Sequence, residues 1–164
     1  MSYDRSTVEA VDVGVVGNRR QTELRQNWML PVKMLEYAAM EIPTIAPRLR
    51  VIQHYFDGVH EGDADKLAAI FHPSADLRSL EKGELRILKL PAWLDYFRKR
   101  ASAKAEGKPR EDFIVTIDRA DDQTAFIKVR CQLPPRYFTD YLVAMKLNDG
   151  WKIVSKSYRY DLRD

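Results

Sequence analysis

Two side chains, Tyr55 and Lys156, have residue types and sequence surroundings that suit the binding or activation of a small molecule. Tyr55 lies in a stretch where Ile52, Phe56 and Val59 recur at spacings of three and four, which predicts a helix with one apolar face. A tyrosine on such a face is usually a core residue with a locally satisfied hydroxyl, but it can also donate a hydrogen bond into a cavity. Both interpretations stay open at this point.

Lys156 lies in an apolar and aromatic stretch near the end of the chain, after a strong two-residue hairpin signal at Asp149-Gly150. If these two residues form the turn, Val143 faces Lys156 and Tyr141 faces Tyr158 across the hairpin. Lys156 then projects to the same face as Val143, and a lysine near a low-dielectric cavity loses its proton more easily or binds an anion. A slip of one residue would instead turn it toward solvent, where lysines normally lie.

Other chemistries have weak support in the sequence. His72 is the remaining acid–base candidate, but a histidine between a helix end and Pro73 more often satisfies backbone groups. His54 and His60 are not spaced i, i+4, and no cluster of histidines and carboxylates has metal-ligand spacing. No Ser-His-Asp constellation, glycine-rich phosphate loop or thiolate motif is present. We therefore expect neither a metal nor a cofactor.

The elements that would position these residues follow from apolar periodicity and from helix-stop signals. Gly62 is predicted to end the first helix, Asp63 to cap a short second one, and Pro91 to open a third that continues to Gly107. The predicted strands span residues 75–80, 85–90, 113–117, 125–133, 137–147 and 151–160. Alternating apolar residues in 125–133 indicate a sheet with one buried face. The sequence therefore predicts an α+β domain with helices packed on one face of a curved antiparallel sheet.

The long helix, the Gly-Asp break, the short helix and the Phe before a strand resemble the opening of the nuclear transport factor 2-like fold. Within that superfamily, the chain is most similar to the putative lumazine-binding subgroup, through the segments F-D-G-V-H-E-G-D, F-H-P-S-A, G-E-L-R-I-L, Y-F-T-D-Y-L and G-W-K-I-V-S-K. The resemblance covers residues 46–160 and implies a cone-shaped fold, with three helices on a curved antiparallel sheet and an apolar pocket between them. Relatives include ketosteroid isomerase, scytalone dehydratase, polyketide cyclases and inert binding proteins, so the fold alone decides little about function.

A residue-by-residue comparison with ketosteroid isomerase implies that its activity is absent. Tyr55 falls where that family has its oxyanion-binding tyrosine. Ser79 falls on the position of the general base, and Val143 falls on that of the protonated aspartate. The isomerase needs a carboxylate base and two donors aimed at one oxygen, and the comparison leaves only one of these groups.

Three functions remain as hypotheses. The preferred one is a small-molecule-binding protein that holds a flat, mostly apolar or aromatic ligand in a pocket. The pocket is expected to contain Tyr55, Trp93, Phe97, Val129, Tyr141, Val143, Lys156 and Tyr158. The alternative is a cofactor-independent enzyme of the dehydratase, cyclase or isomerase type. The third is an interaction module with a vestigial pocket.

We expect a homodimer that associates through the outer face of the sheet, because a broad uncovered sheet face commonly marks association. The residues expected to face outward are Lys128, Arg130 and Gln132, with Phe138 and Leu142 on the neighbouring strand.

Composition fits one ordinary globular domain. The chain has 164 residues, of which 45% are hydrophobic and 31% charged, with a net charge of +3. The small charge and the lack of basic residues interleaved with aromatics argue against a nucleic acid partner. No stretch reaches the length of a membrane span. Cys131 is the only cysteine, so no disulfide forms within the chain, and we expect a cytoplasmic location.

Residues 1–45 differ from the rest of the chain and are expected to be an N-terminal extension preceding a domain at 46–164. One interpretation is a poorly ordered or strand-swapping arm. The other is that translation starts at Met40, because the apolar periodicity is complete after Pro43.

Overall fold

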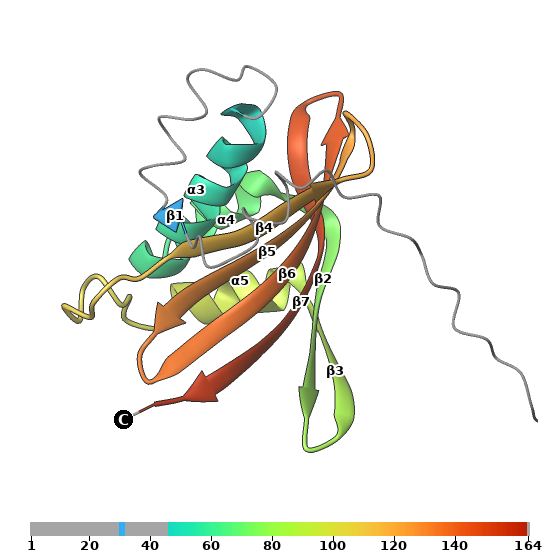
Figure 1. Cartoon of the computed structure of the whole chain (residues 1–164). Helices are drawn as coiled ribbons and strands as arrows, with labels where there is room; N and C mark the ends of the chain where they lie inside the picture. The colour runs from blue at the N-terminus through green and yellow to red at the C-terminus, as the bar shows by residue number, and fades with distance from the viewer. Residues whose placement is uncertain (1–29, 32–45, 164) are drawn as a thin grey trace, which may run out of the picture.

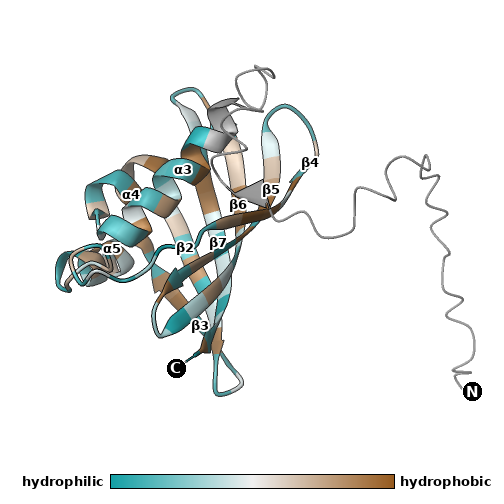
Figure 2. Ribbon diagram, turned by 60° about the vertical axis from the view of Figure 1, so that its left-hand side comes forward, coloured by the Kyte–Doolittle hydropathy of each residue, from teal (hydrophilic) through white to brown (hydrophobic). Residues whose placement is uncertain are grey.

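The computed structural model describes residues 30–31 and 46–163, and it has helices on one side of a single curved sheet (Figures 1 and 2). The helices are α3 (Ala46–Glu61), α4 (Ala64–Ile70) and α5 (Leu90–Arg98). The strands are β1 (Leu30–Pro31), β2 (Phe71–Glu81), β3 (Glu84–Lys89), β4 (Phe113–Arg119), β5 (Thr124–Leu133), β6 (Arg136–Leu147) and β7 (Gly150–Leu162). None of the described helices is long and apolar enough to cross a membrane.

The break between α3 and α4 forms as its residue types predict. Gly62 has a φ of +68°, a conformation that glycine adopts without a Cβ penalty. The side chain of Asp63 then caps α4 by accepting hydrogen bonds from the backbone N–H groups of Asp65 at 3.1 Å and Lys66 at 2.8 Å. Because of this break, α4 packs against α3, and β2 begins directly after α4.

The prediction for the third helix was too long. α5 ends at Arg98, well before Gly107, and no large apolar residue continues its buried stripe after Phe97. The segment that follows forms turns instead. It is anchored by Ala103, which is buried, and by the backbone N–H of Lys104, which donates to the carbonyl of His60 at 3.1 Å.

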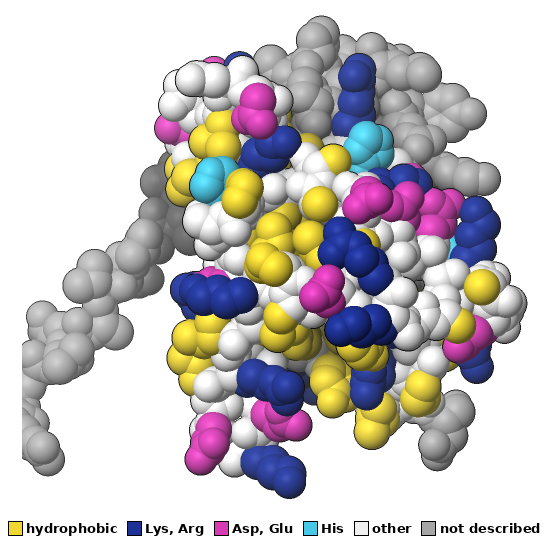
Figure 3. Space-filling model, turned by 180° about the vertical axis from the view of Figure 1, so that it is seen from behind, with side chains coloured by type: hydrophobic (Ala, Val, Ile, Leu, Met, Phe, Trp, Pro, Cys, Tyr) yellow, Lys and Arg dark blue, Asp and Glu magenta, His cyan; other side chains and the backbone are white. Residues whose placement is uncertain are grey.

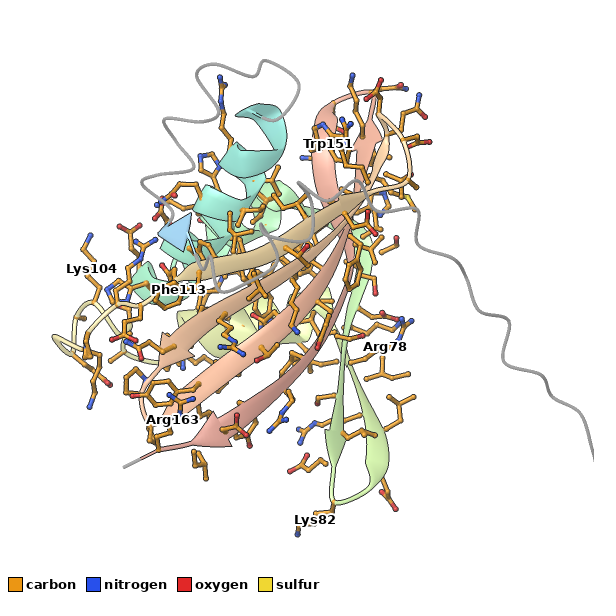
Figure 4. The ribbon with its side chains drawn as sticks, in the orientation of Figure 1. Arg78, Lys82, Lys104, Phe113, Trp151 and Arg163 are labelled. Atoms are coloured by element: carbon orange, nitrogen blue, oxygen red, sulfur yellow. The ribbon has the colours of Figure 1, made fainter. Side chains whose placement is uncertain are left out.

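The sheet is mixed, which corrects the antiparallel prediction. Its strand order is β1-β4-β5-β6-β7-β2-β3, and β2 pairs with β7 in parallel while the other pairs are antiparallel. The β2–β3 hairpin extends from one end of the molecule, where Lys82 marks its tip, and Trp151 lies at the opposite end (Figure 4). β2, the strand that follows α4, therefore lies beside β7, the last of the described strands.

The β6–β7 register also differs from the prediction. The turn is made by Asn148 and Asp149, with Leu147 paired to Gly150, and a register shift follows between Val143 and Ala144. As a result Lys156 pairs with Leu142, and Val143 pairs with Ser155. The net difference from the predicted register is one residue, which moves the β6 side chains to the opposite faces.

This register reverses part of the predicted outer face. Leu142 is fully buried under the helices, and Phe138 also points to the inner side. Gln132 is buried as well, and its Nε2 donates to the carbonyl of Pro109 at 3.2 Å. Of the predicted outward row, Arg130 is exposed and Lys128 is half-buried.

The structure describes only Leu30–Pro31 within the N-terminal extension. These two residues pair with Ile114 and Phe113 at the edge of β4. The rest of residues 1–45, and Asp164, lie outside the described residues, so the predictions for this extension remain predictions.

Candidate functional site

A cavity of about 410 Å³ lies between the helices and the inner face of the sheet. α3 and α5 supply one wall, and β2, β3, β5, β6 and β7 supply the other. Aromatic side chains dominate its lining: Tyr55, Trp93, Tyr96, Phe97, Phe138, Tyr158 and Tyr160. Its polar lining is Ser79, Glu81, Arg86, Arg100, Arg136 and Lys156. Such a lining suits a flat apolar molecule held by a few polar groups.

A buried polar network lies at the inner end of this cavity. The hydroxyl of Tyr55 donates to Asp140 Oδ2 at 2.7 Å, and Lys156 Nζ donates to the hydroxyl of Tyr55. Lys156 Nζ also lies 3.2 Å from Asp140 Oδ1. This last contact is an ion pair rather than an aligned hydrogen bond, because Oδ1 accepts none from the described residues. The network thus joins α3, β6 and β7.

All three members of this network are withdrawn from water. The exposed fractions are 0% for Tyr55, 0% for Asp140 and 4% for Lys156. A charge buried this deeply is tolerated only with a partner, and here Lys156 and Asp140 neutralise each other. The lysine therefore brings no net charge to the inner end of the cavity.

Four aromatic rings surround the ammonium of Lys156. Its Nζ lies 5.0 Å from the ring centroid of Tyr158, 5.1 Å from Tyr55, 5.3 Å from Trp93 and 5.9 Å from Phe138. Cation–π attraction to these rings adds to the ion pair in holding the ammonium in place. Of its three N–H groups, one donates to the hydroxyl of Tyr55, and the others have no aligned acceptor among the described residues, because the contact with Asp140 is an ion pair.

The surroundings of Tyr55 make its hydroxyl a weaker acid than that of an ordinary tyrosine. Burial, and next the negative charge of Asp140, raise the pKa of Tyr55 well above its usual value. The same two causes raise the pKa of Cys131, whose Sγ lies 3.4 Å from Asp140 Oδ2. Tyr55 has a single proton, and the hydrogen bond to Asp140 uses it. The N–H groups of Lys156 that do not donate to Tyr55 are therefore the donors that this network can offer to a ligand.

The structure brings together most of the side chains predicted to form a pocket. Tyr55, Trp93, Phe97, Lys156 and Tyr158 all line the cavity. Val129 is buried in the hydrophobic core beside Asp140, its partner across the β5–β6 ladder, and does not reach the lining.

Tyr141 and Val143 lie on the other face of the sheet, because the predicted register was wrong. Tyr141 stacks on Phe126 with 5.9 Å between the ring centroids, and Lys128 Nζ lies 5.3 Å from the Tyr141 ring. Val143 is paired with Phe126 and Ser155. The alternation of faces along β6 places Asp140 and Leu142 on the inner side instead.

The inner carboxylate, Asp140, was missed by the sequence interpretation. Both faces of β6 carry large apolar residues, so alternation did not show which row points inward. One signal was available: a lysine placed on the concave face requires a nearby carboxylate, and Asp140 is the acidic residue in the facing strand.

His72 does not belong to the site. Its Nδ1 lies 2.6 Å from the hydroxyl of Ser74 and accepts the backbone N–H of the same residue at 3.2 Å, so it organises the start of β2. Among the described residues no group of three or more His, Cys, Asp or Glu side chains could hold a metal ion.

Comparison with known protein families assigns this chain to one of them. The profile of the putative lumazine-binding family matches residues 45–159 of this chain. No curated protein matches.

Solved structures resemble the chain at low sequence identity. An NTF2-like protein of unknown function from Silicibacter pomeroyi is 24% identical, with a TM-score of 0.63 over 71% of this chain and 95% of that chain. Another, from Shewanella baltica, is 18% identical, with a TM-score of 0.64 over 76% and 97%. A ketosteroid isomerase-like protein from Erwinia carotovora atroseptica is 11% identical, with a TM-score of 0.56 over 73% and 97%. At these identities the likeness concerns the fold alone, whereas the profile covers most of the chain. The chain belongs to the putative lumazine-binding family.

Proposed function

We propose that this protein binds a small, flat, mostly apolar molecule in the cavity without converting it. The observation that carries the proposal is the environment of Lys156. Its ammonium is held by Tyr55 and Asp140, surrounded by aromatic rings, and has N–H groups without an aligned acceptor at the inner end of the cavity. A ligand carbonyl or ring nitrogen is the natural acceptor for such an N–H, while the aromatic walls hold the body of the ligand.

Turnover by a dehydratase, cyclase or isomerase mechanism has less support. Such an enzyme needs a base near neutral pKa or an acid able to give up its proton. The proton of Tyr55 is held by Asp140, and its pKa is raised. Asp140 is paired with Lys156, and Glu81, the carboxylate in the cavity lining, is paired with Arg86. Ser79 lies in the lining at the position that the isomerase comparison gave to the general base.

The probe for binding is N-phenyl-1-naphthylamine, a neutral, flat, apolar molecule whose fluorescence rises in apolar sites. Titration of the protein should give a single saturable increase. Ser79→Phe places a ring in the cavity and should weaken binding by about tenfold or more, since overfilling a packed site excludes the ligand. Ser157→Phe makes the same change on the exposed outer face of β7 and should leave binding unchanged.

Two results contradict the proposal. One is the absence of saturable binding by the unsubstituted protein. The other is equal binding by the Ser79→Phe and Ser157→Phe proteins, which would place the probe elsewhere on the surface.

We further propose that the protein is a cytoplasmic homodimer that associates through the outer face of β5 and β6. The support is a group of side chains on that face. Phe126 is 40% exposed and Met145 is 39% exposed, and Phe126 pairs with Val143 and stacks on Tyr141. The chain has one cysteine, Cys131, which is buried and forms no disulfide, and this agrees with a reducing compartment such as the cytoplasm.

A further inference from the structure

The mouth of the cavity carries positive charge that the described carboxylates do not balance. In the lining, Lys156 is neutralised by Asp140, and Arg86 by Glu81. Arg100 and Arg136 also line the cavity, and neither forms an ion pair with a described carboxylate. The unbalanced charge therefore belongs to these two arginines. Figure 3 shows the molecule from behind, with Lys and Arg side chains set among hydrophobic ones.

Both arginines converge on one oxygen. Arg136 Nη1 donates to the hydroxyl of Tyr96 at 3.3 Å, and Arg100 Nη1 lies 3.5 Å from the same atom. They reach it from different parts of the fold, because Arg100 follows α5 and Arg136 begins β6. Two like charges that approach a single neutral acceptor repel each other, and an anion placed between them would remove that repulsion.

The guanidinium of Arg100 has donors to spare. It lies 4.8 Å from the ring centroids of both Tyr96 and Phe97, which hold its plane in position. Its Nε and Nη2 are buried and have no hydrogen-bond partner among the described residues. Buried donors without partners are costly, and they are a common feature of sites that a ligand completes.

Tyr96 supplies a further donor. Its hydroxyl accepts from the two arginines, so its own proton is free to bond to a ligand. Partial burial raises the pKa of Tyr96, but hydrogen bonding by Arg136 and the charge of Arg100 outweigh this and lower it overall. The lowered pKa shows that the arginines favour negative charge at this point.

We propose that Arg100, Arg136 and Tyr96 bind an oxyanion, and that this oxyanion is part of the same molecule whose apolar body fills the cavity. The ligand is then a small amphipathic anion, with a carboxylate or phosphate at the mouth and a flat body reaching toward Lys156. A planar guanidinium matches the geometry of such oxygens, because it offers paired N–H groups. This inference rests on the proposed function.

The test compares two fluorescent probes with one body. 1-Anilinonaphthalene-8-sulfonate carries an oxyanion, and N-phenyl-1-naphthylamine lacks it. The sulfonate should bind more tightly to the unsubstituted protein, and its affinity should fall with added salt while that of the neutral probe stays constant. Arg100→Gln and Arg136→Gln should each weaken binding of the sulfonate by about tenfold more than they weaken binding of the neutral probe, since a lost charged hydrogen bond affects the sulfonate alone.

Arg98→Gln is the matched control, because Arg98 lies at the end of α5, outside the cavity lining, and is paired with Asp95 and Asp65. It should change neither affinity. Competition by 1-naphthoate and by 1-naphthyl phosphate, with neutral 1-naphthamide for comparison, distinguishes a carboxylate ligand from a phosphate ligand. At least one of the two anions should displace the probe more effectively than the amide.

The outcomes separate the two proposals. If neither probe binds, the proposed function itself fails. If the neutral probe binds in the cavity but the sulfonate has no advantage, or keeps its advantage in both glutamine variants, the anion site is refuted and the binding function stands. Equal displacement by the anions and the amide refutes it as well.

Discussion

Tyr55 and Asp140 are 85 positions apart in the chain, yet a hydrogen bond of 2.7 Å joins their fully buried side chains. The bond links α3 to the inner face of β6 and fixes the carboxylate that neutralises Lys156. The inner end of the cavity is therefore a polar network whose charges are paired, although Asp140 Oδ1 accepts no hydrogen bond from the described residues. Networks of this kind are costly to break at one member and cheaper to remove whole.

The first prediction concerns this ion pair. Lys156→Met leaves the Asp140 carboxylate buried without its counter-ion, and Asp140→Leu leaves the ammonium in the same condition. Each change should lower the free energy of unfolding by about 3–5 kcal/mol. The double variant should cost much less than the sum of the two, because both charges are gone.

Urea unfolding of the four proteins measures this coupling. The exposed pair of Arg98 and Asp95 serves as the control, with an expected coupling of about 0–1 kcal/mol. Additive costs at Lys156 and Asp140 would contradict the pairing.

The second prediction concerns acid stability and Glu61, at the end of α3. Hydrogen bonds from Lys66 at 2.5 Å and Lys104 at 2.9 Å lower the pKa of Glu61 to about 2. The pKa of Glu61 is lower in the folded protein than in the unfolded chain, where it is about 4.3. The ionised carboxylate and its two lysine partners therefore stabilise the fold at pH values above about 4.3. That contribution is lost as the pH falls from there toward 2.

Glu61→Gln should therefore be less stable than the unsubstituted protein near pH 6, and the difference should shrink as the pH falls toward 3. Glu106→Gln removes an exposed carboxylate nearby and should show no such convergence. Urea midpoints at several pH values measure it. A difference that is constant with pH would rule out the ionic contribution.

The third prediction concerns Gly58, in the interior of α3. Alanine at an exposed helical position normally stabilises by about 1 kcal/mol relative to glycine. Here an added Cβ would lie 2.7 Å from Leu67 Cγ and 2.8 Å from Leu67 Cδ2, and Leu67 is fully buried in α4. Gly58→Ala should therefore destabilise by about 1–3 kcal/mol, as overpacking does.

The midpoint of thermal unfolding shows whether Gly58→Ala destabilises or stabilises the protein. His54→Ala, at an exposed position of the same helix, should change the midpoint little. A raised midpoint for Gly58→Ala would show that α3 and α4 separate without cost.

The fourth prediction concerns association. If the outer face of β5 and β6 forms the dimer, Phe126→Asp places a charge in the interface, so sedimentation at micromolar concentration should show single chains instead of pairs. Leu85→Asp changes an equally apolar and more exposed residue on β3, and should leave the dimer intact. A monomer in the unsubstituted protein would end the dimer proposal.

The parts of the fold that could be predicted from sequence depend on local signals. Gly62 and Asp63 define the helix break through their own backbone and capping preferences, and the alternation in β5 shows its buried face without reference to other strands. The parallel pairing of β2 with β7 has no such local signature, since it depends on where two distant strands meet.

The site was harder to predict, because it depends on register. The turn at Asn148 and Asp149, together with the shift after Val143, moved Asp140 inward, and neither feature shows in residue types where both rows of β6 are apolar. Arg100 and Arg136 belong to different elements and meet only at Tyr96 in the folded chain. Their sequence surroundings resemble ordinary solvated charges.

The parallel pairing of β2 with β7 determines when the sheet can form during synthesis of the chain. β2 is made before β4, β5 and β6, but β7, its neighbour opposite β3, is made after every other described strand. Asp140 leaves the ribosome before Lys156, so its carboxylate stays hydrated until β7 is free to pair. A message truncated before codon 156 therefore yields a protein in which β7 is too short to join β2 and β3 fully to β6, Asp140 lacks its counter-ion, and the apolar inner face is open to chaperones and proteases.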